Sequence, residues 1–144
     1  LLNKLAYVWQ GTEIMRKELL FNNWRYRFQV RFDDEEEWLE GTSVIVGKSR
    51  YYAGRYNLFF GASLGSPQLH VALFTGDKRS DFIRYAACIA MEALTLDNDI
   101  IIRKARRLEI RCNEENFAAE LDGDAVTTTP LVIEMEPEPI IFLA

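Results

Sequence analysis

The sequence has few of the residues that most often carry chemistry: one histidine and two cysteines among 144 residues. Cys88 and Cys112 lie far apart without CxxC spacing, so neither a zinc knuckle nor a redox dithiol is indicated, and both are expected to be reduced and buried. No stretch approaches the roughly 20 apolar residues that span a bilayer, and the N-terminus lacks a basic-then-apolar signal pattern. These absences favour a cytoplasmic protein.

Positive charge is also in short supply. The formal net charge is −5 and the pI is about 5.0. Nucleic-acid binding relies on clustered Lys and Arg that release counterions from the phosphate backbone. The composition therefore argues against a nucleic-acid partner.

Local motifs for catalysis are missing as well. The sequence contains no Walker loop, no GxGxxG before a helix and no HExxH. His70 lies inside an apolar stretch without a serine or cysteine nucleophile motif, so we interpret it as structural, because a catalytic triad needs a nucleophile and an orienting group together. No single motif identifies an enzyme.

What is present is a pattern of short strands in one domain. The chain has 144 residues, 49% of them hydrophobic, which is enough for one sizeable core. Apolar and polar side chains alternate over residues 24–32, as in a strand with one buried face. Further strands are predicted at 38–46, 69–74, 100–102, 108–111, 117–121, 131–135 and 140–143.

Two helices complete the predicted elements. Leu1 to about Arg16 shows helical spacing without an initiating cap, as if something preceded Leu1. A second helix is predicted from Ser80 or Asp81, either of which can cap it, to Leu94. The expected fold is mainly β: a β-sandwich of many short antiparallel strands with one inserted helix and an N-terminal helix.

Three segments allow a functional as well as a structural interpretation. The acidic run 33–37 is interpreted as a solvated hairpin loop rather than a cation site. The aromatic stretch 51–60, punctuated by glycines, either packs in the core between turns or lines an acyl pocket. The basic cluster 103–107 is either a solvated face or a surface that touches anionic lipid headgroups.

The sharpest local feature is Leu121-Asp122-Gly123-Asp124, which lies between a predicted strand and the run 125–129. Taken alone, Asp-Gly between strands is an ordinary hairpin turn, because both residues tolerate positive φ. The stretches around it support a second, functional interpretation.

Three stretches together resemble the second domain of the diacylglycerol kinase, sphingosine kinase and bacterial lipid kinase family, over nearly the full chain. Residues 46–55, VGKSRYYAGR, look like the family's N-G-R-x-x-G-G strand and turn. Residues 58–71, LFFGASLGSPQLHV, are similar to P-x-A-x-x-D-D-G-x-L-x-V. Phe117 to Asp124, followed by Pro130-Leu131 and Glu136-Pro137, resembles the D-G-E motif, a proline, a hydrophobic strand and P-x-A.

The resemblance implies one substrate-side, C-terminal domain over residues 1–144, of the NAD kinase and diacylglycerol kinase-like fold. An N-terminal domain with a G-G-D-G-T loop, absent from this chain, would bind ATP. The substrate would be a lipid hydroxyl, of diacylglycerol or a sphingoid base. Carried over by position, Asp122 is the general base, Gly123 lets the backbone approach the phosphates, and Asp124 is its catalytic companion near Mg²⁺.

The chain departs from the family pattern in three places. Gly65-Ser66-Pro67 stands where the family commonly has D-D-G, whose aspartates bind a structural cation in relatives; Lys48-Ser49 replaces N-G; and Asp124 replaces a glutamate. The alternative function is a non-catalytic β-sandwich that binds lipid or protein, because a fold does not fix a function. A transient contact with a membrane surface and self-association stay open.

Overall fold

The computed structural model describes residues 26–52, 56–121 and 124–136. The expected helix at 1–16, the start of the first strand at Trp24, the turn at Pro137-Glu138-Pro139 and the final strand at 140–143 lie outside the described residues.

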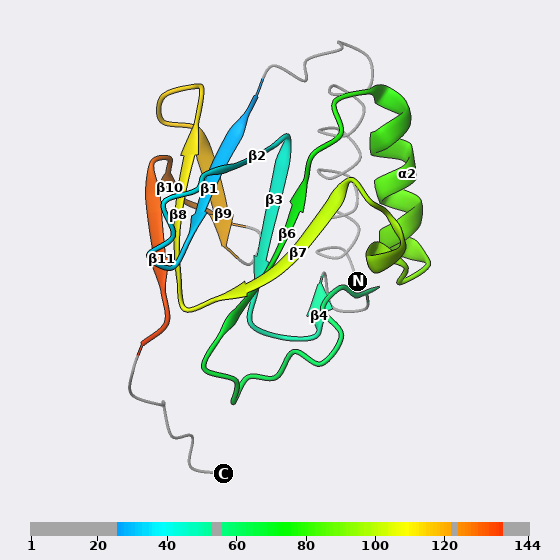
Figure 1. Ribbon diagram of the computed structural model, residues 1–144, viewed down its shortest axis with the longest axis horizontal. Coiled ribbons are helices and arrows are strands. Elements are labelled where there is room, and N and C mark those ends of the chain that lie inside the picture. The colour runs from blue at the N-terminus through cyan, green and yellow to red at the C-terminus, as the bar shows by residue number, and fades with distance from the viewer. Residues whose placement is uncertain (1–25, 53–55, 122–123, 137–144) are drawn as a thin grey trace.

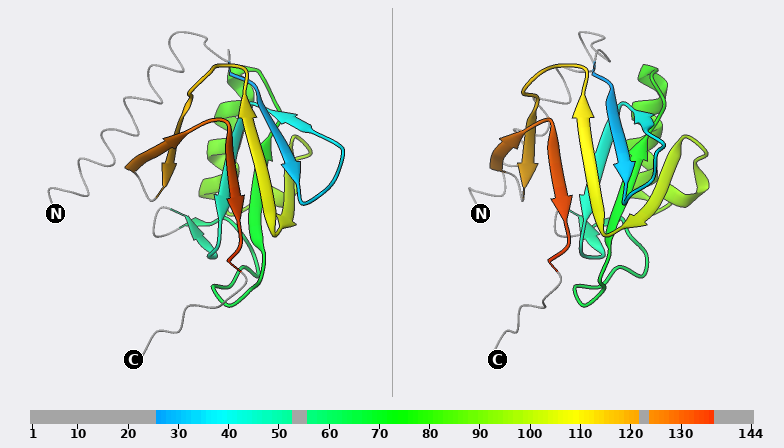
Figure 2. Two further views of the ribbon diagram at one scale, coloured as in Figure 1. Left: turned by 90° about the vertical axis from the view of Figure 1, so that its left-hand side faces the viewer. Right: turned by 60° about the vertical axis from the view of Figure 1, so that its left-hand side comes forward.

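Two antiparallel sheets form the body of the described structure, and one helix covers the outer face of the second sheet (Figures 1 and 2). The first sheet has the order β11-β8-β1-β2, from Leu131–Glu134, Arg107–Cys112, Phe28–Phe32 and Leu39–Gly41. The second has the order β3-β6-β7, from Ser43–Gly47, Leu69–Phe74 and Ile100–Ala105. Two small hairpins stand apart: β4 (Tyr51–Tyr52) with β5 (Tyr56–Asn57), and β9 (Ala118–Leu121) with β10 (Asp124–Thr128). The mainly β, sandwich-like fold expected from the sequence is confirmed.

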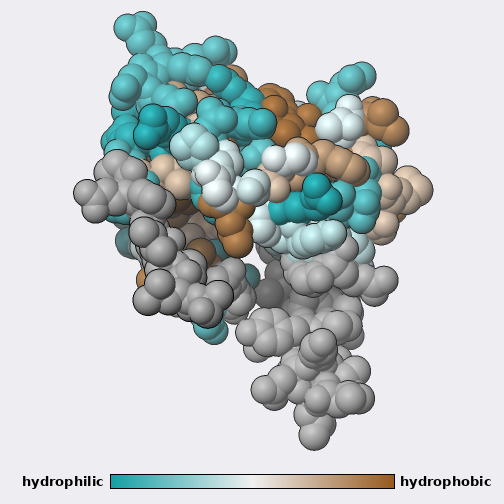
Figure 3. Space-filling view, turned by 90° about the horizontal axis from the view of Figure 1, so that it is seen from below, coloured by the Kyte–Doolittle hydropathy of each residue, from teal (hydrophilic) through white to brown (hydrophobic). Residues whose placement is uncertain are grey.

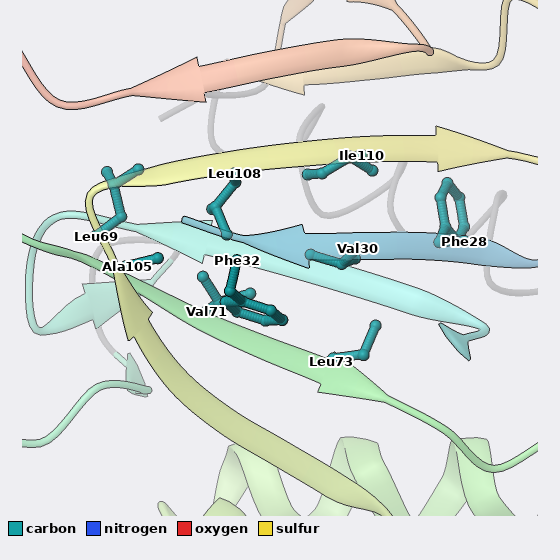
Figure 4. Packing of buried hydrophobic residues seen from close by; sticks show 9 residues of the cluster. All are labelled: Phe28, Val30, Phe32, Leu69, Val71, Leu73, Ala105, Leu108 and Ile110. Atoms are coloured by element: carbon teal, nitrogen blue, oxygen red, sulfur yellow. The ribbon is translucent and has the colours of Figure 1, made fainter. Parts of the chain in front are cut away.

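The main core lies between the two sheets (Figure 4). Alternate residues of β1 point inward, so Phe28, Val30 and Phe32 are buried while Gln29 and Arg31 are not. β8 pairs with β1 in antiparallel register and adds Leu108 and Ile110. Residues facing them from the second sheet are Leu69, Val71, Leu73 and Ala105. Period-two patterning thus fixes which face of each strand enters the core.

β6 is buried along both faces. Its odd-numbered residues face the first sheet, whereas Ala72 and Phe74 belong to a second core cluster with Tyr85 and Cys88 of the helix α2 (Arg79–Ala90). This explains why 69–74 reads as a continuous apolar run rather than as an alternating one. The strand predicted there has the observed bounds.

The single strand predicted over 38–46 is wrong in one respect: the structure divides it into β2 and β3, which belong to different sheets. The chain turns at Thr42, whose backbone N–H donates to Phe74 O at 2.7 Å and whose hydroxyl donates to Gly76 O at 2.8 Å. Gly41 permits this corner, because a Cβ there would lie 2.6 Å from Phe74 O. The corner depends on these contacts across the fold, which local patterning does not encode.

The internal helix begins and ends earlier than predicted. Lys78, rather than Ser80 or Asp81, occupies the N-cap, and the Asp81 carboxylate accepts a hydrogen bond from the Lys78 backbone N–H at 3.0 Å. The helix ends at Ala90; Glu92 has a positive φ of 56°, and Leu94–Leu96 forms a separate 3₁₀ turn, η1. Asp81 therefore stabilises the helix start from its first turn.

The acidic run after β1 is a hairpin loop, because β1 and β2 pair in antiparallel register on either side of it. Asp33 adopts φ 51° and accepts hydrogen bonds from the backbone N–H groups of Arg106 (2.7 Å) and Arg107 (3.0 Å). Arg103 forms a bidentate ion pair with Glu35, and this hydrogen bonding lowers the pKa of the Glu35 carboxyl. The loop thus fastens the corner between β7 and β8, in line with a structural role.

Candidate functional site

The Asp122-Gly123-Asp124 motif joins the two strands of the β9–β10 hairpin. Asp124 opens β10 and faces Leu121, the last residue of β9, in antiparallel register. Asp122 and Gly123 lie outside the described residues, so their predicted roles stay predictions. Asp124 is exposed, and no ion pair within the described part of the chain engages its carboxylate. The hairpin expected from the sequence is present on both sides of the motif.

This hairpin packs only lightly against the rest of the described chain. All five residues of β10 are exposed, and the apolar side chains of Leu121 and Val126 are exposed as well. It is anchored at its base, where the Thr129 N–H donates to Phe117 O at 2.8 Å and the Phe117 ring contacts those of Tyr26 and Phe28. Leu121 and Asp124 therefore lie at the end of the hairpin opposite its anchored base.

A cleft of about 620 Å³ lies beside the base of this arm. Its lining includes Thr129, whose hydroxyl is buried without a hydrogen-bond partner among the described residues, and the half-buried Cys112. Other lining residues come from β8, from the turn before β9 and from β11: Glu109–Arg111, Glu114–Asn116 and Pro130–Val132. Asp124 does not line the cleft, so the cleft and Asp124 are separate features of the described surface.

His70 lies in the middle strand of the second sheet and is buried there, as the structural interpretation expects. Its ring is 5.7 Å from that of Phe59, and its Nε2 has no hydrogen-bond partner in the described part of the chain. Burial, together with the charges of Lys104 and Lys48, lowers the pKa of the imidazole. A small cavity of about 90 Å³ adjoins His70, with Glu92 and Lys104 also in its lining.

The aromatic stretch divides between core and surface. Phe59 is buried in the cluster beneath α2, whereas Tyr51, Tyr52 and Phe60 are exposed. Gly47 makes the close approach expected of a glycine here, because a Cβ would lie 2.6 Å from the Phe59 ring. The acyl-pocket hypothesis for this stretch stays a prediction. The exposed rings of Tyr51, Tyr52 and Phe60 lie at the surface and do not enclose a pocket.

The described residues offer limited means of holding a metal or nucleotide. They contain no group of three or more His, Cys, Asp or Glu side chains arranged to hold a metal ion. Mg²⁺ in phosphoryl-transfer sites is often held by one or two carboxylates together with substrate phosphates and water, and the exposed Asp124 carboxylate fits that requirement. For ATP itself, the sequence has no phosphate-binding loop.

The comparisons with known proteins agree with this architecture. Residues 1–144 match the family model described as the YegS C-terminal NAD kinase beta sandwich-like domain. The chain belongs to this family. No curated protein sequence matches the chain.

Solved structures of the same fold come from Bacillus anthracis str. Sterne. A protein described as "a putative diacylglycerol kinase" superposes with a TM-score of 0.63 at 22% identity, over 77% of this chain and 36% of that one. A structure described as that of a diacylglycerol kinase gives a TM-score of 0.57 at 20% identity, over 78% of this chain and 42% of that one. The YegS-family chain thus spans less than half the length of these relatives, and at such identities the likeness shows the fold.

None of the helices in the described residues is both long enough and apolar enough to cross a membrane.

Proposed function

We propose that this YegS-family chain is the C-terminal, substrate-side domain of an ATP-dependent lipid kinase. The enzyme transfers the γ-phosphoryl group of ATP to a hydroxyl of a diacylglycerol or a sphingoid base. The site lies where the β9–β10 hairpin meets an N-terminal nucleotide-binding domain of the same protein, and this chain alone is inactive.

The observation that carries the proposal is the exposed hairpin with the Asp-Gly-Asp motif at its end. A two-stranded hairpin is marginal by itself and gains stability by packing on something else. Leu121 and Val126 present apolar surface on this arm, on either side of the motif. An opposing domain that covers these side chains would also bring bound ATP to the aspartates.

The chemistry asks little of the chain beyond one well-placed carboxylate. Phosphoryl transfer depends mainly on positioning and on stabilising charge. Asp122 accepts the proton of the lipid hydroxyl as the hydroxyl oxygen bonds to the γ-phosphorus and the bond to the β-phosphate oxygen breaks, releasing ADP. Gly123, without a side chain, leaves room for the phosphates.

Asp124 is the residue of this chain suited to a metal. Mg²⁺ bound there would neutralise the charge that develops on the transferring phosphoryl group. The Asp124 carboxylate also holds this end of the hairpin close to the nucleotide. Most contacts to ATP come from the N-terminal domain.

The test is lipid phosphorylation by the intact protein on a panel of diacylglycerols and sphingoid bases. Because a general base contributes about 10²–10⁴-fold, Asp122→Asn is expected to lower kcat by that factor. Asp34→Asn is the matched control, because Asp34 is an exposed carboxylate in the β1–β2 hairpin loop. An unchanged rate in Asp122→Asn would refute the assigned base.

The rival function, a non-catalytic binding domain, is favoured by Gly65-Ser66-Pro67, which lacks the acidic residues typical of lipid-kinase relatives. It predicts no phosphorylation of any lipid by the intact protein. A phosphorylated product that disappears when ATP is omitted would exclude it.

A further inference from the structure

Four large aromatic or aliphatic side chains at one end of the molecule are exposed to solvent. Tyr51 and Tyr52 of β4 are 59% and 44% exposed, and Phe60 and Leu64 of the loop after β5 are 63% and 74% exposed. Contiguous apolar groups at a surface often mark an interaction site. We call Tyr51, Tyr52, Phe60 and Leu64 the aromatic tip.

The two segments of the tip are fastened to each other. The carbonyl oxygen of Arg50 accepts hydrogen bonds from the N–H groups of Leu58 (3.0 Å) and Phe59 (3.3 Å), which join the strand side of the tip to the loop side. Lys48 Nζ donates to Ser66 O further along the same loop. The exposed side chains therefore stand on a supported scaffold.

The tip lies at the lower end of the sandwich in Figure 1, where the β4 hairpin and the loop between β5 and β6 project together. Seen from below, pale and brown residues run through the middle of this face, between a broad hydrophilic area on the left and smaller hydrophilic patches on the right (Figure 3).

The charge of this region is opposite to that of the whole chain. Residues 41–76 include Lys48, Arg50 and Arg55 but no Asp or Glu, although the chain has 22 acidic residues and a net charge of −5. Lys104 lies at the same end, because its β7 position pairs with His70, which in turn pairs with Gly47. One acidic group adjoins this region: Glu92 accepts a hydrogen bond from the Asn57 N–H at 3.3 Å and lines the small cavity with Phe60 and Lys104. Aromatic groups in a segment whose own charges are all positive are complementary to an anionic lipid surface, since Tyr favours the headgroup level and Lys and Arg attract anionic lipids.

The arginines of the basic cluster at 103–107 are less suited to docking than Lys104. Arg103 pairs with Glu35, and Arg107 pairs with Glu109. Asp33 accepts hydrogen bonds from the backbone N–H groups of Arg106 and Arg107. Carboxylates thus offset the charge of two of the four basic side chains, and no large apolar side chain among the described residues of 103–107 is exposed.

We propose that the aromatic tip docks this domain on the surface of a bilayer containing anionic phospholipid, with Phe60 and Leu64 entering the interface and Arg50 and Lys104 facing the headgroups. Only the biological role of this docking depends on the proposed lipid-kinase function, because docking would hold the enzyme at the membrane that contains its substrate. The binding itself needs neither ATP nor catalysis.

The test is co-sedimentation of the intact protein with vesicles of phosphatidylglycerol and phosphatidylethanolamine, without nucleotide. The double variant Phe60→Ser/Leu64→Ser is expected to reduce partitioning at least tenfold. Ile83→Ser/Val132→Ser is the matched control, because these side chains are 63% and 56% exposed on α2 and β11. The control should bind as the wild type does.

A second comparison tests the charges. Arg50→Gln should weaken binding at low salt and reduce its dependence on salt, whereas Arg106→Gln should change neither. Thermal melts of all variants show whether the fold is kept. Equal partitioning of Phe60→Ser/Leu64→Ser and wild type, or no binding by the wild type, would overturn the proposal.

The catalytic role of Asp122 and the docking of the aromatic tip fail separately. Docking is measured without ATP, whereas Asp122→Asn is assayed on lipid dispersed in detergent. If Asp122→Asn keeps full activity while the tip variants lose vesicle binding, the assigned base is wrong and the docking surface stands.

Discussion

The backbone of Gly41 lies directly against the side chain of Leu73, so that a Cβ on Gly41 would be 2.5 Å from Leu73 Cδ1. Leu73 is fully buried in the main core, and Gly41 ends β2 at the corner where the chain passes from one sheet to the other. A side chain at position 41 could be accommodated only by displacing Leu73 or the backbone of the corner.

We therefore expect Gly41→Ala to destabilise the protein by about 1–3 kcal/mol, the usual cost of forcing an extra carbon into a packed core. Urea denaturation measures the change in unfolding free energy. Gly65→Ala is the control, because the nearest atom to a Cβ there is Ser63 Oγ at 3.9 Å. Equal stability of the two variants would contradict this account of the corner.

His70 should make stability depend on pH. Burial, aided by Lys104 and Lys48, lowers its pKa in the folded state below the ordinary value of 6.5. Between these two pKa values the unfolded chain binds a proton that the folded chain does not, so stability is full above about pH 6.5 and falls as the pH decreases toward the folded-state pKa. His70→Gln should flatten the change in Tm between pH 7.5 and 5.5. A slope identical to that of the wild type would show that His70 does not contribute.

The two thiols should differ in reactivity. Burial, and then the charge of Asp97, raises the pKa of the Cys88 thiol, whereas Cys112 is half-buried in the lining of the large cleft. The thiolate is the reactive form, so a thiol reagent should label Cys112 in the folded protein well before Cys88. Each of the variants Cys88→Ser and Cys112→Ser keeps one thiol, so mass spectrometry of their labelling gives the two rates separately. Faster labelling of Cys88 would contradict the burial described here.

Asp124 should affect metal dependence rather than stability. Because its side chain is exposed, Asp124→Asn should leave Tm within about 1 °C of the wild type, in keeping with the small effects of surface substitutions. Under the proposed function it should raise the Mg²⁺ concentration needed for half-maximal lipid phosphorylation by about tenfold. Asp124→Glu, which restores a carboxylate and the family's usual residue, should recover most of the loss. An unchanged Mg²⁺ titration in Asp124→Asn would remove Asp124 from the metal site.

The fold was predictable where one strand carries its own pattern. β1 alternates strictly, and the apolar run of β6 is closed off by Pro67 before it and by Gly76 after it. The corner at Thr42 could not be predicted from the sequence, because it depends on hydrogen bonds to the carbonyl groups of Phe74 and Gly76, more than 30 residues away. The start of the helix was misplaced for a related reason. Asp81 accepts the Lys78 N–H hydrogen bond from within the first turn, and the sequence alone does not distinguish that position from the N-cap.

The candidate site was predictable only through resemblance. Asp-Gly-Asp between two strands has the composition of any tight turn, and nothing local separates a catalytic aspartate from a turn residue. The exposed aromatic residues were missed because composition alone assigns such side chains to a core. A sequence observation that points to them is the absence of acidic residues between Glu40 and Asp77.

β6 is covered by the first sheet on one side and by the second core cluster beneath α2 on the other, and it is flanked by β3 and β7. Its amide hydrogens can meet solvent only when the two layers separate. Deuterium exchange at residues 69–74 should therefore follow global unfolding, whereas the β9–β10 arm should exchange through local opening. The slowest-exchanging amides of the described chain would then report the stability of the whole sandwich.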